Sequence, residues 1–339
     1  MRSRVITLAT VTLWTLCVDV CLSADLQSSA SSRPNIVWIM AEDISTELGC
    51  YGHPAVKTPT LDGLARQGTR YENAFCTAPS CTPSRNAMMT GVYQTRTDTQ
   101  DQRRRGVVLP RGLKPITHWL QSAGYYTALG CGYSGKTDLN FKVSRLFDGK
   151  DWRGREPGQP FFAQITLYET HRLPEAGGWG GIRAQSRDPV DPAEVELPPY
   201  FPDHPVCRED WAMYLDAMEF VDAQVGNILE RLEDERIADN TVVIFSGDNG
   251  RCHLRGKCWL YEGGTHVPLI IRWPGEIEPN TVNDDLVSMV DISATILDIA
   301  KIPLPGYLDG FLRTLLDGWI AGTNDKGLAR PKPLGQPVQ

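Results

Sequence analysis

Short apolar runs alternate along the chain with segments of helical periodicity. The apolar runs are rich in β-branched and aromatic residues, and several end abruptly on polar residues, which is typical of buried strands. By this pattern we expect strands at 34–40, 125–130, 160–168, 241–250 and 267–275. Helices are expected at 58–68, from 211 to near 239, and at 291–300. Strands that alternate with helices predict an α/β fold, with a mostly parallel central sheet and helices on both faces.

Local signals mark the ends of some elements. Thr58 followed by Pro59 is typical of a helix start, and Gly68 is typical of a helix stop. Residues 174–206 are rich in Pro, Gly and Asp and have no periodicity, so we expect a long loop or an insertion there.

Polar residues follow the apolar runs at the places where ligands bind in such sheets. Glu42 and Asp43 end the first strand, and Asp248 and Asn249 end a later one. Ligands bind beyond the carboxyl ends of parallel strands. Three carboxylates and one amide oxygen suit Ca²⁺ or Mg²⁺ better than zinc. The alternative is that these residues are turn and cap residues only.

The stretch CTPSR at 81–85 is a second candidate site. Thr82 can cap a helix that begins at Pro83, and Gly91 can end it. Cys81 would then lie just outside a helix N-terminus, where the free N–H groups favour an anion. The alternative is a small buried cysteine beside a well-formed cap.

Composition and charge exclude little except a nucleic-acid partner. The 339 residues are 41% hydrophobic and 22% charged, enough for one large α/β domain. Lys and Arg total 34 against 41 Asp and Glu, and this net charge of −7 argues against nucleic acid. A local cationic pocket could still bind an anionic substrate. Three arginines at 103–105 could contact a sulfated polymer, and a solvated loop is the alternative.

The N-terminus has the layout of a cleaved export signal. Two arginines precede an apolar run over 5–22, which Asp19 interrupts, and small residues follow the run. We expect a signal peptide at 1–24 and a linker at 25–33, and therefore no stable membrane anchor. A membrane anchor of about 18 residues is the alternative.

The cysteine count bears on how the cysteines could pair after export. Removing the signal leaves seven of the nine cysteines, an odd number, so in an oxidising compartment at least one stays unpaired or is chemically diverted. Cys252 and Cys258 are close enough in the sequence for a small loop bridge.

Several motifs together carry a resemblance to a known family. CTPSR followed by Thr90 and Gly91 resembles the signature of the type I, formylglycine-dependent sulfatases, of the alkaline phosphatase-like superfamily. PNIVWIMAED and TPTLDGLARQG are similar to the segments that precede this signature in the family. SGDNG resembles the second metal motif, and GKCWLYEGG resembles the segment with the family's lysine. The resemblance runs in order over 34–308.

The resemblance implies roles for nine residues. Cys81 would be oxidised to Cα-formylglycine by a formylglycine-generating machinery, and its hydrate would supply both the attacking hydroxyl and the one that later expels sulfate. Arg85 would orient this group, and His171 with Lys257 would protonate the leaving oxygen. Lys136 and Lys257 would bind the sulfate, with His171 beside them. Ca²⁺, or alternatively Mg²⁺, would be held by five residues: Glu42, Asp43, Cys81, Asp248 and Asn249.

The sequence departs from the family in three places. Glu42 stands where an aspartate is usual, and its extra methylene would shift the ion or its coordination. Asp138 stands where many members have histidine, and an acid there would perturb or replace that role. This variant resembles the heparan N-sulfatase-like branch. The family's C-terminal subdomain is expected to be short or missing, with an abbreviated or loose tail at 309–339.

The expected protein is therefore an exported sulfatase, periplasmic or extracellular, or lysosomal or secretory in a eukaryote. It would hydrolyse sulfate esters or N-sulfates of a sulfated carbohydrate or a similar small molecule. Two alternatives stay open at this point. One is a phosphodiester or phosphonate monoester hydrolase of the same superfamily, and the other is a catalytically weak glycan-binding pseudoenzyme.

Overall fold

The structure is a computed structural model that describes residues 33–172 and 178–308, with one compact unit from Pro34 onward. The expected signal peptide, all of the linker except its last residue, and the tail at 309–339 lie outside the described residues. Within the described part of the chain, no helix is both long and apolar enough to cross a membrane.

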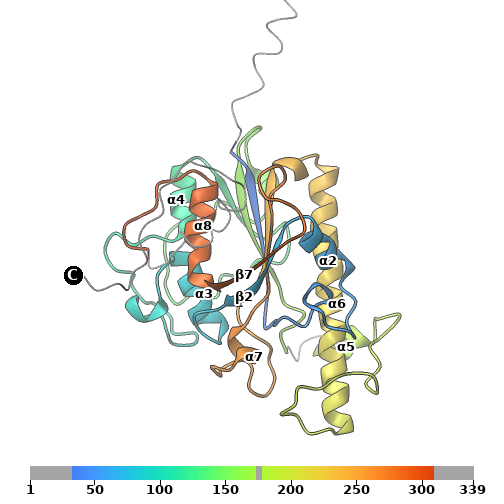
Figure 1. The fold of residues 1–339 in the computed structure, drawn as a ribbon. Helices are drawn as coiled ribbons and strands as arrows, with labels where there is room; N and C mark the ends of the chain where they lie inside the picture. The colour runs from blue at the N-terminus through green and yellow to red at the C-terminus, as the bar shows by residue number, and fades with distance from the viewer. Residues whose placement is uncertain (1–32, 173–177, 309–339) are drawn as a thin grey trace, which may run out of the picture. The chain divides into compact units, whose positions relative to one another are not determined.

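A seven-stranded sheet forms the centre of the unit (Figure 1). Its strand order is β3-β4-β1-β5-β6-β2-β7, and only β6 runs antiparallel to its neighbours. The strands are β1 (Asn35–Ala41), β2 (Thr69–Phe75), β3 (Tyr126–Leu129), β4 (Phe161–Leu167), β5 (Thr241–Gly247), β6 (Leu269–Arg272) and β7 (Thr281–Ser288). The expected α/β fold with a mostly parallel sheet is confirmed.

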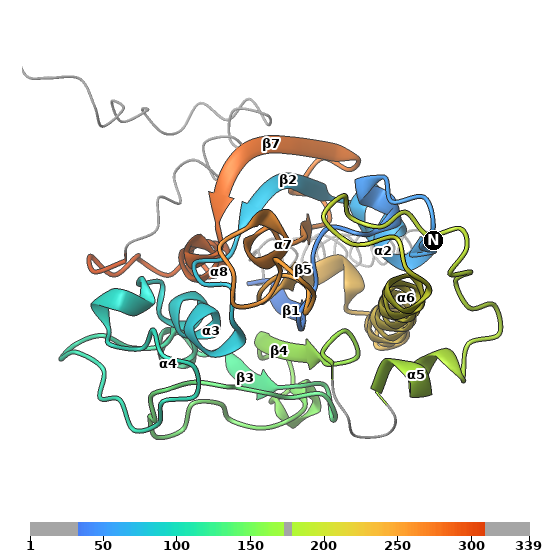
Figure 2. The same ribbon diagram turned by 90° about the horizontal axis from the view of Figure 1, so that it is seen from below.

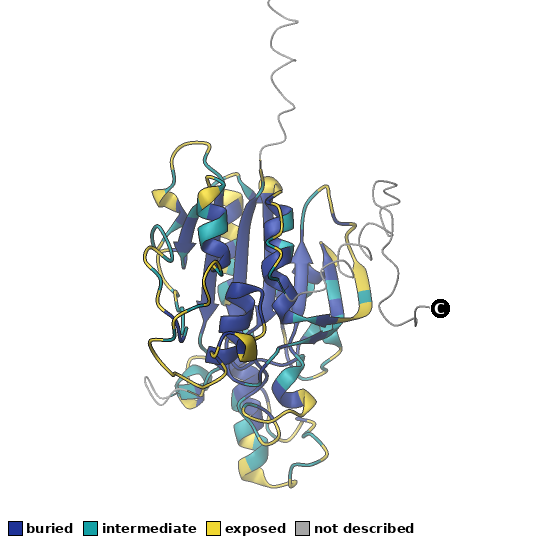
Figure 3. Cartoon of the chain, turned by 90° about the vertical axis from the view of Figure 1, so that its left-hand side faces the viewer, coloured by how far each residue is buried: buried dark blue, intermediate teal, exposed yellow. Residues whose placement is uncertain are grey.

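Helices cover both faces of this sheet and bury two apolar clusters. On one side are α2 (Pro59–Arg66), α5 (Gly178–Arg183) and α6 (Pro205–Asp234). On the other are α3 (Cys81–Thr90), α4 (Ile116–Ser122) and α8 (Ile292–Ile299). Strand β1 supplies Val37 and Ile39 to the first cluster and Ile36 and Trp38 to the second. Because both faces are covered, β1 is buried along its whole length (Figure 3), which explains its continuous apolar run.

The expected strands are all present, and the sequence pattern missed two more. β2 was missed because half-buried residues interrupt its apolar positions. β7 was missed because it is an edge strand with mostly exposed residues, including two acids, and therefore carries no apolar pattern. The run at 267–275 yields a strand of only four residues, β6, since Pro268 and Pro274 flank it.

The helix boundaries also differ from expectation. α6 begins at Pro205, six residues before the first residue of its periodic pattern, because His204 caps it by accepting a hydrogen bond from the Val206 amide at 3.2 Å. It ends at Asp234, earlier than expected. The segment 174–206, expected to be a loop, contains the short helix α5.

Helix α3 begins two residues earlier than the sequence suggested. Its cap residue is Ser80, so Cys81 is the first residue of the helix instead of lying outside it. The hydroxyl of Thr82 is buried without a hydrogen-bond partner, so Thr82 is not the cap. Gly91 ends the helix as expected, with φ of 66° and its amide donating to the Ala87 carbonyl.

Candidate active site

The polar ends of β1 and β5 meet at one edge of the sheet. The register pairs Ala41 with Gly247, so the residues that follow these strands are neighbours. The amide of Asp43 donates to Asp248 Oδ1 at 3.1 Å, and Asn249 Nδ2 donates to Asp43 Oδ1 at 2.9 Å. Figure 2 looks along the sheet from below and shows β1 and β5 together with α3 and α7 (Glu262–Thr265). The two strand-end pairs thus form one buried cluster.

Arg85 joins this cluster from the first turns of α3. Its Nε donates to Asp248 Oδ2 at 2.8 Å, and its Nη2 donates to Glu42 Oε1 at 3.0 Å. The guanidinium also donates to Thr166 Oγ1 at 3.1 Å. Burial opposes its charge, but the carboxylates of Asp248 and Glu42 raise the pKa of Arg85. Arg85 is therefore a fixed cation between the ends of β1, β4 and β5.

Two lysines bind the carboxylates from loops. Lys257 Nζ lies 2.7 Å from Asp43 Oδ1 and 3.0 Å from Oδ2. Lys136 Nζ contacts Glu42 Oε1 and lies 3.3 Å from Asp138 Oδ2. Burial opposes both charges, but Asp43 raises the pKa of Lys257 and Glu42 raises that of Lys136. Both lysines are ammonium ions at neutral pH.

Close backbone packing places the loop that carries Lys257. A Cβ at Gly256 would lie 2.0 Å from the Arg251 carbonyl oxygen, and one at Gly264 would lie 2.2 Å from the Trp259 carbonyl oxygen. Only glycine fits at these two positions. The amide of Cys258 then donates to the Pro79 carbonyl, which brings this loop against the start of α3.

Cys81 faces the cluster and is fully buried. Gln102 Nε2 donates to its Sγ at 3.0 Å. Burial, with a further contribution from Asp248, raises the pKa of the thiol to about 11, and Lys257 only partly opposes this. An unmodified Cys81 is therefore a protonated thiol at neutral pH and a poor nucleophile.

The unusual acid at 138 also lies at this site. Asp138 has a left-handed backbone, with φ of 49°. Burial opposes its charge, but Lys136, together with the neighbouring Cys81 and Thr82, lowers the pKa of Asp138. A carboxylate thus stands beside residue 81.

His171 approaches the same carboxylates from the loop after β4. Its Nε2 lies 3.7 Å from Asp43 Oδ2, and its Nδ1 is buried without a hydrogen-bond partner. The preceding Thr170 donates its hydroxyl hydrogen bond to the Glu42 carbonyl and so fixes this loop on the end of β1. The structure therefore brings all nine residues singled out in the sequence to one place.

The donor set fits a hard divalent cation in its chemistry. Glu42, Asp43, Asp248 and Asn249 offer only oxygen ligands, and Asn249 Oδ1 is buried with no hydrogen-bond partner among the residues that the structure describes. Burial is the largest effect on Glu42 and raises its pKa although Arg85 opposes it. In the described residues no three His, Cys, Asp or Glu side chains adopt a metal-binding grouping. Here the carboxylates engage Arg85, Lys136 and Lys257 instead.

A second ionic group supports the site and was missed in the sequence. Asp210 on α6 receives two hydrogen bonds of 2.7 Å from Arg172, and His253 Nε2 lies 3.2 Å from it. The His253 ring packs between aromatic rings at centroid distances of 4.9–5.9 Å, those of Trp179, Phe201, Trp211 and Tyr214. Arg172 directly follows His171, and His253 precedes Lys257 by four residues. We name Arg172, Asp210 and His253 the aromatic-cage triad.

No sequence signal identified this triad or Gln102, because each residue acts through a contact with a segment distant in the sequence. The expected bridge between Cys252 and Cys258 is wrong, since all seven cysteines of the described residues are free thiols. A bridge is not needed to close this loop, because the glycine contacts and the triad already hold it.

Comparisons with known proteins agree with this geometry. A family model described as Sulfatase matches residues 34–148 and 145–302. An ulvan-active sulfatase of Formosa agariphila is 32% identical over 327 residues, covering 82% of this chain and 54% of that protein. N-sulphoglucosamine sulphohydrolase of Homo sapiens is 28% identical over 320 residues, covering 81% of this chain and 62% of that protein. The chain spans little more than half the length of these relatives.

Solved structures share the fold. The phosphonate monoester hydrolase of Agrobacterium radiobacter has a TM-score of 0.66 at 20% identity, covering 84% of this chain and 77% of that one. A protein solved with its substrate D-glucosamine-2-N,6-O-disulfate has a TM-score of 0.62 at 18% identity, covering 82% and 78%. At such identities the likeness shows the fold alone, and it agrees with the α/β architecture with a mostly parallel sheet.

Proposed function

This chain belongs to the sulfatase family, and we propose that it hydrolyses sulfate esters or N-sulfates of a sulfated carbohydrate. The observation that carries this proposal is the position of Cys81. It is the first residue of α3, and Asp248 and Lys257 are among the charges that act on its thiol. A sulfate at this place would meet cations on two sides and a helix N-terminus on the third.

Cys81 itself cannot serve as the nucleophile, because its thiol is held protonated. We therefore propose that it is oxidised to Cα-formylglycine by a formylglycine-generating machinery. The hydrate of this aldehyde supplies an oxygen nucleophile with a second hydroxyl on the same carbon. Gln102 and Asp138, which contact the thiol here, would then hold those hydroxyl groups.

Lys136 and Lys257 are proposed to bind the sulfate oxygens. Both are charged, and each is anchored to a carboxylate at one side, so their remaining N–H donors are oriented. Arg85 has its donors committed to Asp248, Glu42 and Thr166, so it positions the carboxylates and residue 81 and is not free to move with substrate.

His171 is proposed as the proton donor to the leaving oxygen or nitrogen. Its Nε2 faces Asp43 Oδ2 at 3.7 Å, so the ring is turned toward the carboxylate cluster where the sulfate would lie. General acids of this kind contribute about 10²–10⁴ to the rate.

The proposed cation is Ca²⁺, with Mg²⁺ as the alternative, held by Glu42, Asp43, Asp248 and Asn249 together with residue 81. When bound, it polarises the sulfate and lowers the pKa of a coordinated hydroxyl. The orphaned Asn249 Oδ1 supports this assignment. Removing the cation with a chelator is therefore expected to abolish turnover.

The substrate class rests on the relatives. Their names refer to ulvan and to N-sulphoglucosamine, both sulfated carbohydrates or their components. We propose a sulfated glycan or a fragment of one as substrate. The N-terminal pattern supports export of the protein to the compartment where such glycans occur.

Mass spectrometry of one tryptic peptide, combined with kinetics, tests this proposal. The peptide 71–85 contains both Cys76 and Cys81, so Cys76 is an internal control. In full-length protein made with the modifying machinery, we expect alkylation at Cys76 and an aldehyde at 81. Sulfate release from an aryl sulfate should require that aldehyde and disappear in Cys81→Ala.

The other readings predict different results. Faster cleavage of a matched phosphodiester or phosphonate than of the sulfate would favour the alternative of a phosphodiester or phosphonate monoester hydrolase. Binding of a sulfated glycan without any turnover, by protein that carries the aldehyde, would refute the enzymatic proposal.

A further inference from the structure

A pocket of about 510 Å³ opens beside the candidate active site. One wall is the loop at 105–106, and the other is the segment from Lys136 to Leu146. Two site residues, Lys136 and Asp138, line it together with residues that have no role in the proposed reaction. The pocket therefore continues outward from the place where the sulfate would lie.

Two cations at this pocket have no anionic partner. Arg105 and Lys142 are exposed, and neither forms an ion pair within the described residues. The adjacent Arg104 differs, because Asp98 and Asp101 hold it at 2.9 and 3.4 Å. The single acid of the pocket, Asp138, already faces Lys136. In a chain with a net charge of −7, this pocket carries a local surplus of positive charge.

The pocket is a built structure and not a gap between loose loops. The amide of Val107 donates to the Asn140 carbonyl at 3.1 Å, and Asn140 Nδ2 donates to the Asp101 carbonyl at 2.7 Å. The amide of Asn140 in turn donates to Asn86 Oδ1 on α3 at 3.1 Å. Both walls are thus fastened to each other and to the helix of Cys81.

Apolar side chains form one part of the pocket's lining, which we call its floor. Phe141 is buried, and Leu139, Val143 and Leu146 are half-buried. A ligand that fits must offer a ring face or a carbon skeleton to this floor and an anionic group to the two cations at the rim. A sugar ring with a sulfate or carboxylate substituent has this combination.

We propose that this pocket binds a second anionic group of the same glycan, while the sulfate to be cleaved lies at Cys81. This proposal rests on the proposed function, since it takes the glycan as substrate. We name the pocket the basic side pocket. It would select substrates with two anionic groups over those with one.

The test compares the double variant Arg105→Ala/Lys142→Ala with the control Arg104→Ala. Arg104 is the matched neighbour whose charge is already neutralised by acids. Turnover is measured on glucosamine N-sulfate, on D-glucosamine-2-N,6-O-disulfate, and on a disaccharide that joins a uronate to glucosamine N-sulfate. The last two distinguish a second sulfate from a carboxylate as the bound group.

We expect the double variant to raise KM about tenfold for at least one dianionic probe, as the loss of one or two charged contacts implies. Its kcat, and its KM for glucosamine N-sulfate, should stay unchanged, as should all constants of Arg104→Ala. Equal KM changes on all three probes, or none, would overturn the proposal.

Binding of the same probes by calorimetry separates this proposal from the proposed function. If the wild-type protein has no turnover but the double variant still binds a dianionic probe about tenfold more weakly, the side pocket stands and the sulfatase proposal fails. If turnover occurs and binding of dianionic probes does not depend on Arg105 and Lys142, the side pocket alone is refuted.

Discussion

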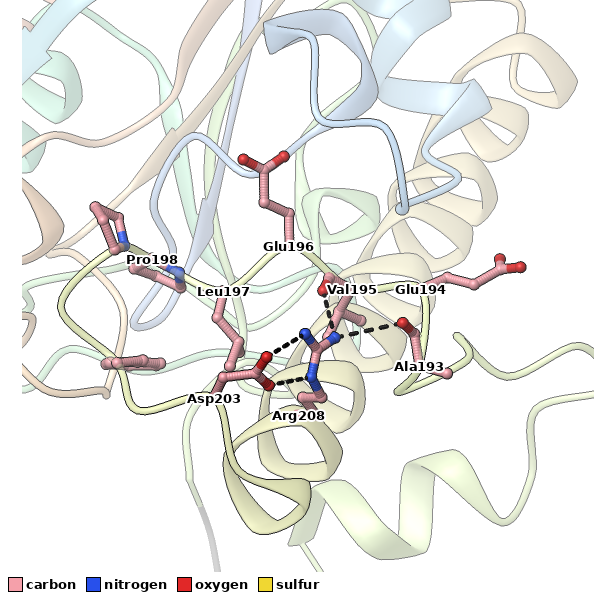
Figure 4. A pocket seen from close by; sticks show the side chains of 10 residues that line it. Ala193, Glu194, Val195, Glu196, Leu197, Pro198, Asp203 and Arg208 are labelled. Carbon is pink, nitrogen blue, oxygen red and sulfur yellow. Dashed lines mark hydrogen bonds and ion pairs between the residues drawn. The ribbon is translucent and has the colours of Figure 1, made fainter.

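Arg85 and Arg208 are both held by carboxylates, but they organise very different regions. Arg85 is 1% exposed and joins acids from the ends of two strands, Glu42 and Asp248. Arg208 is 28% exposed and pairs with Asp203, five residues before it in the sequence. Its other hydrogen bonds go to carbonyl groups of the same loop, that of Pro192 at 3.4 Å and those of Ala193 and Val195 at 3.3 and 3.0 Å, the last two drawn in Figure 4.

The difference lies in what each arginine leaves available. Around Arg208 a pocket of about 430 Å³ is present, but the guanidinium of Arg208 is already paired with Asp203 of the loop that forms the pocket. Around Arg85 the charges are also paired, yet Lys136, Lys257 and His171 face the cluster from outside with donors to spare. The Arg208 region holds a loop on a helix, whereas the Arg85 region has cationic donors that could accept an anion.

Arg85→Lys should have the largest effect of the changes considered. Lysine keeps the charge but cannot donate to Glu42, Asp248 and Thr166 at once. We expect kcat on an aryl sulfate to fall about 10²–10³-fold. Unfolding by urea should show a loss of about 3 kcal/mol, because buried carboxylates lose a partner.

The matched control is Arg208→Lys, which should leave kcat as in the wild type. Comparable kcat losses in both variants would mean that the two regions do not differ in the way proposed here. A wild-type kcat in Arg85→Lys would show that Arg85 has no role in the reaction at the candidate active site.

Asp210→Asn should have an intermediate effect, because Asp210 joins Arg172, which follows His171, to His253, which precedes Lys257 by four residues. We expect kcat to fall about tenfold with KM nearly unchanged, as for a residue that positions catalytic groups. The control is Asp203→Asn, which removes the charge of the carboxylate that pairs with Arg208. It should leave kcat unaltered. A KM increase without a change in kcat would refute the positioning role.

The difference in unfolding free energy between the wild type and Asp210→Asn should also depend on pH. Although burial opposes its charge, His253 and Arg172 lower the pKa of Asp210, so its contribution is fully present above its unfolded pKa of about 4. That contribution is lost as the pH falls through the lower folded value. The wild type should therefore exceed Asp210→Asn by about 1 kcal/mol at pH 7, and the two should converge in acid. A difference that grows in acid would contradict this assignment.

The contrast between these regions also explains what the sequence could predict. The acid pairs at 42–43 and 248–249 were found because each follows a buried apolar run, and parallel strands bring such ends together. The roles of Lys136, His171 and Lys257 were inferred from the resemblance alone. Gln102 and Asp210 act only through contacts with residues distant in the sequence, so neither pattern nor motif revealed them.

The same reasoning applies to the elements. β1 and β5 are buried on both faces; β1 was predicted to within one residue at each end, and β5 begins at Thr241 as predicted but ends at Gly247, three residues early. β7 forms the edge of the sheet, and its pairing with β2 depends on backbone hydrogen bonds that leave no apolar signature. The start of α3 was misplaced because Pro83 was taken as the first helical residue, which made Thr82 the cap; the helix begins at Cys81 instead, and Ser80 is its cap without a side-chain hydrogen bond.

Arg208→Ala should have the smallest effect on function, and this makes it the sharpest test of the comparison. Its hydrogen bonds hold only the loop around residues 193–203, and no candidate catalytic residue takes part in them. We expect kcat and KM for an aryl sulfate to match the wild type, while limited proteolysis within this loop becomes several times faster. Arg104→Ala, at another exposed ion-paired arginine, should not change cleavage at this loop. If Arg208→Ala instead lowered kcat, the loop would have to act on the reaction, and the pocket of Figure 4 would belong to the substrate site.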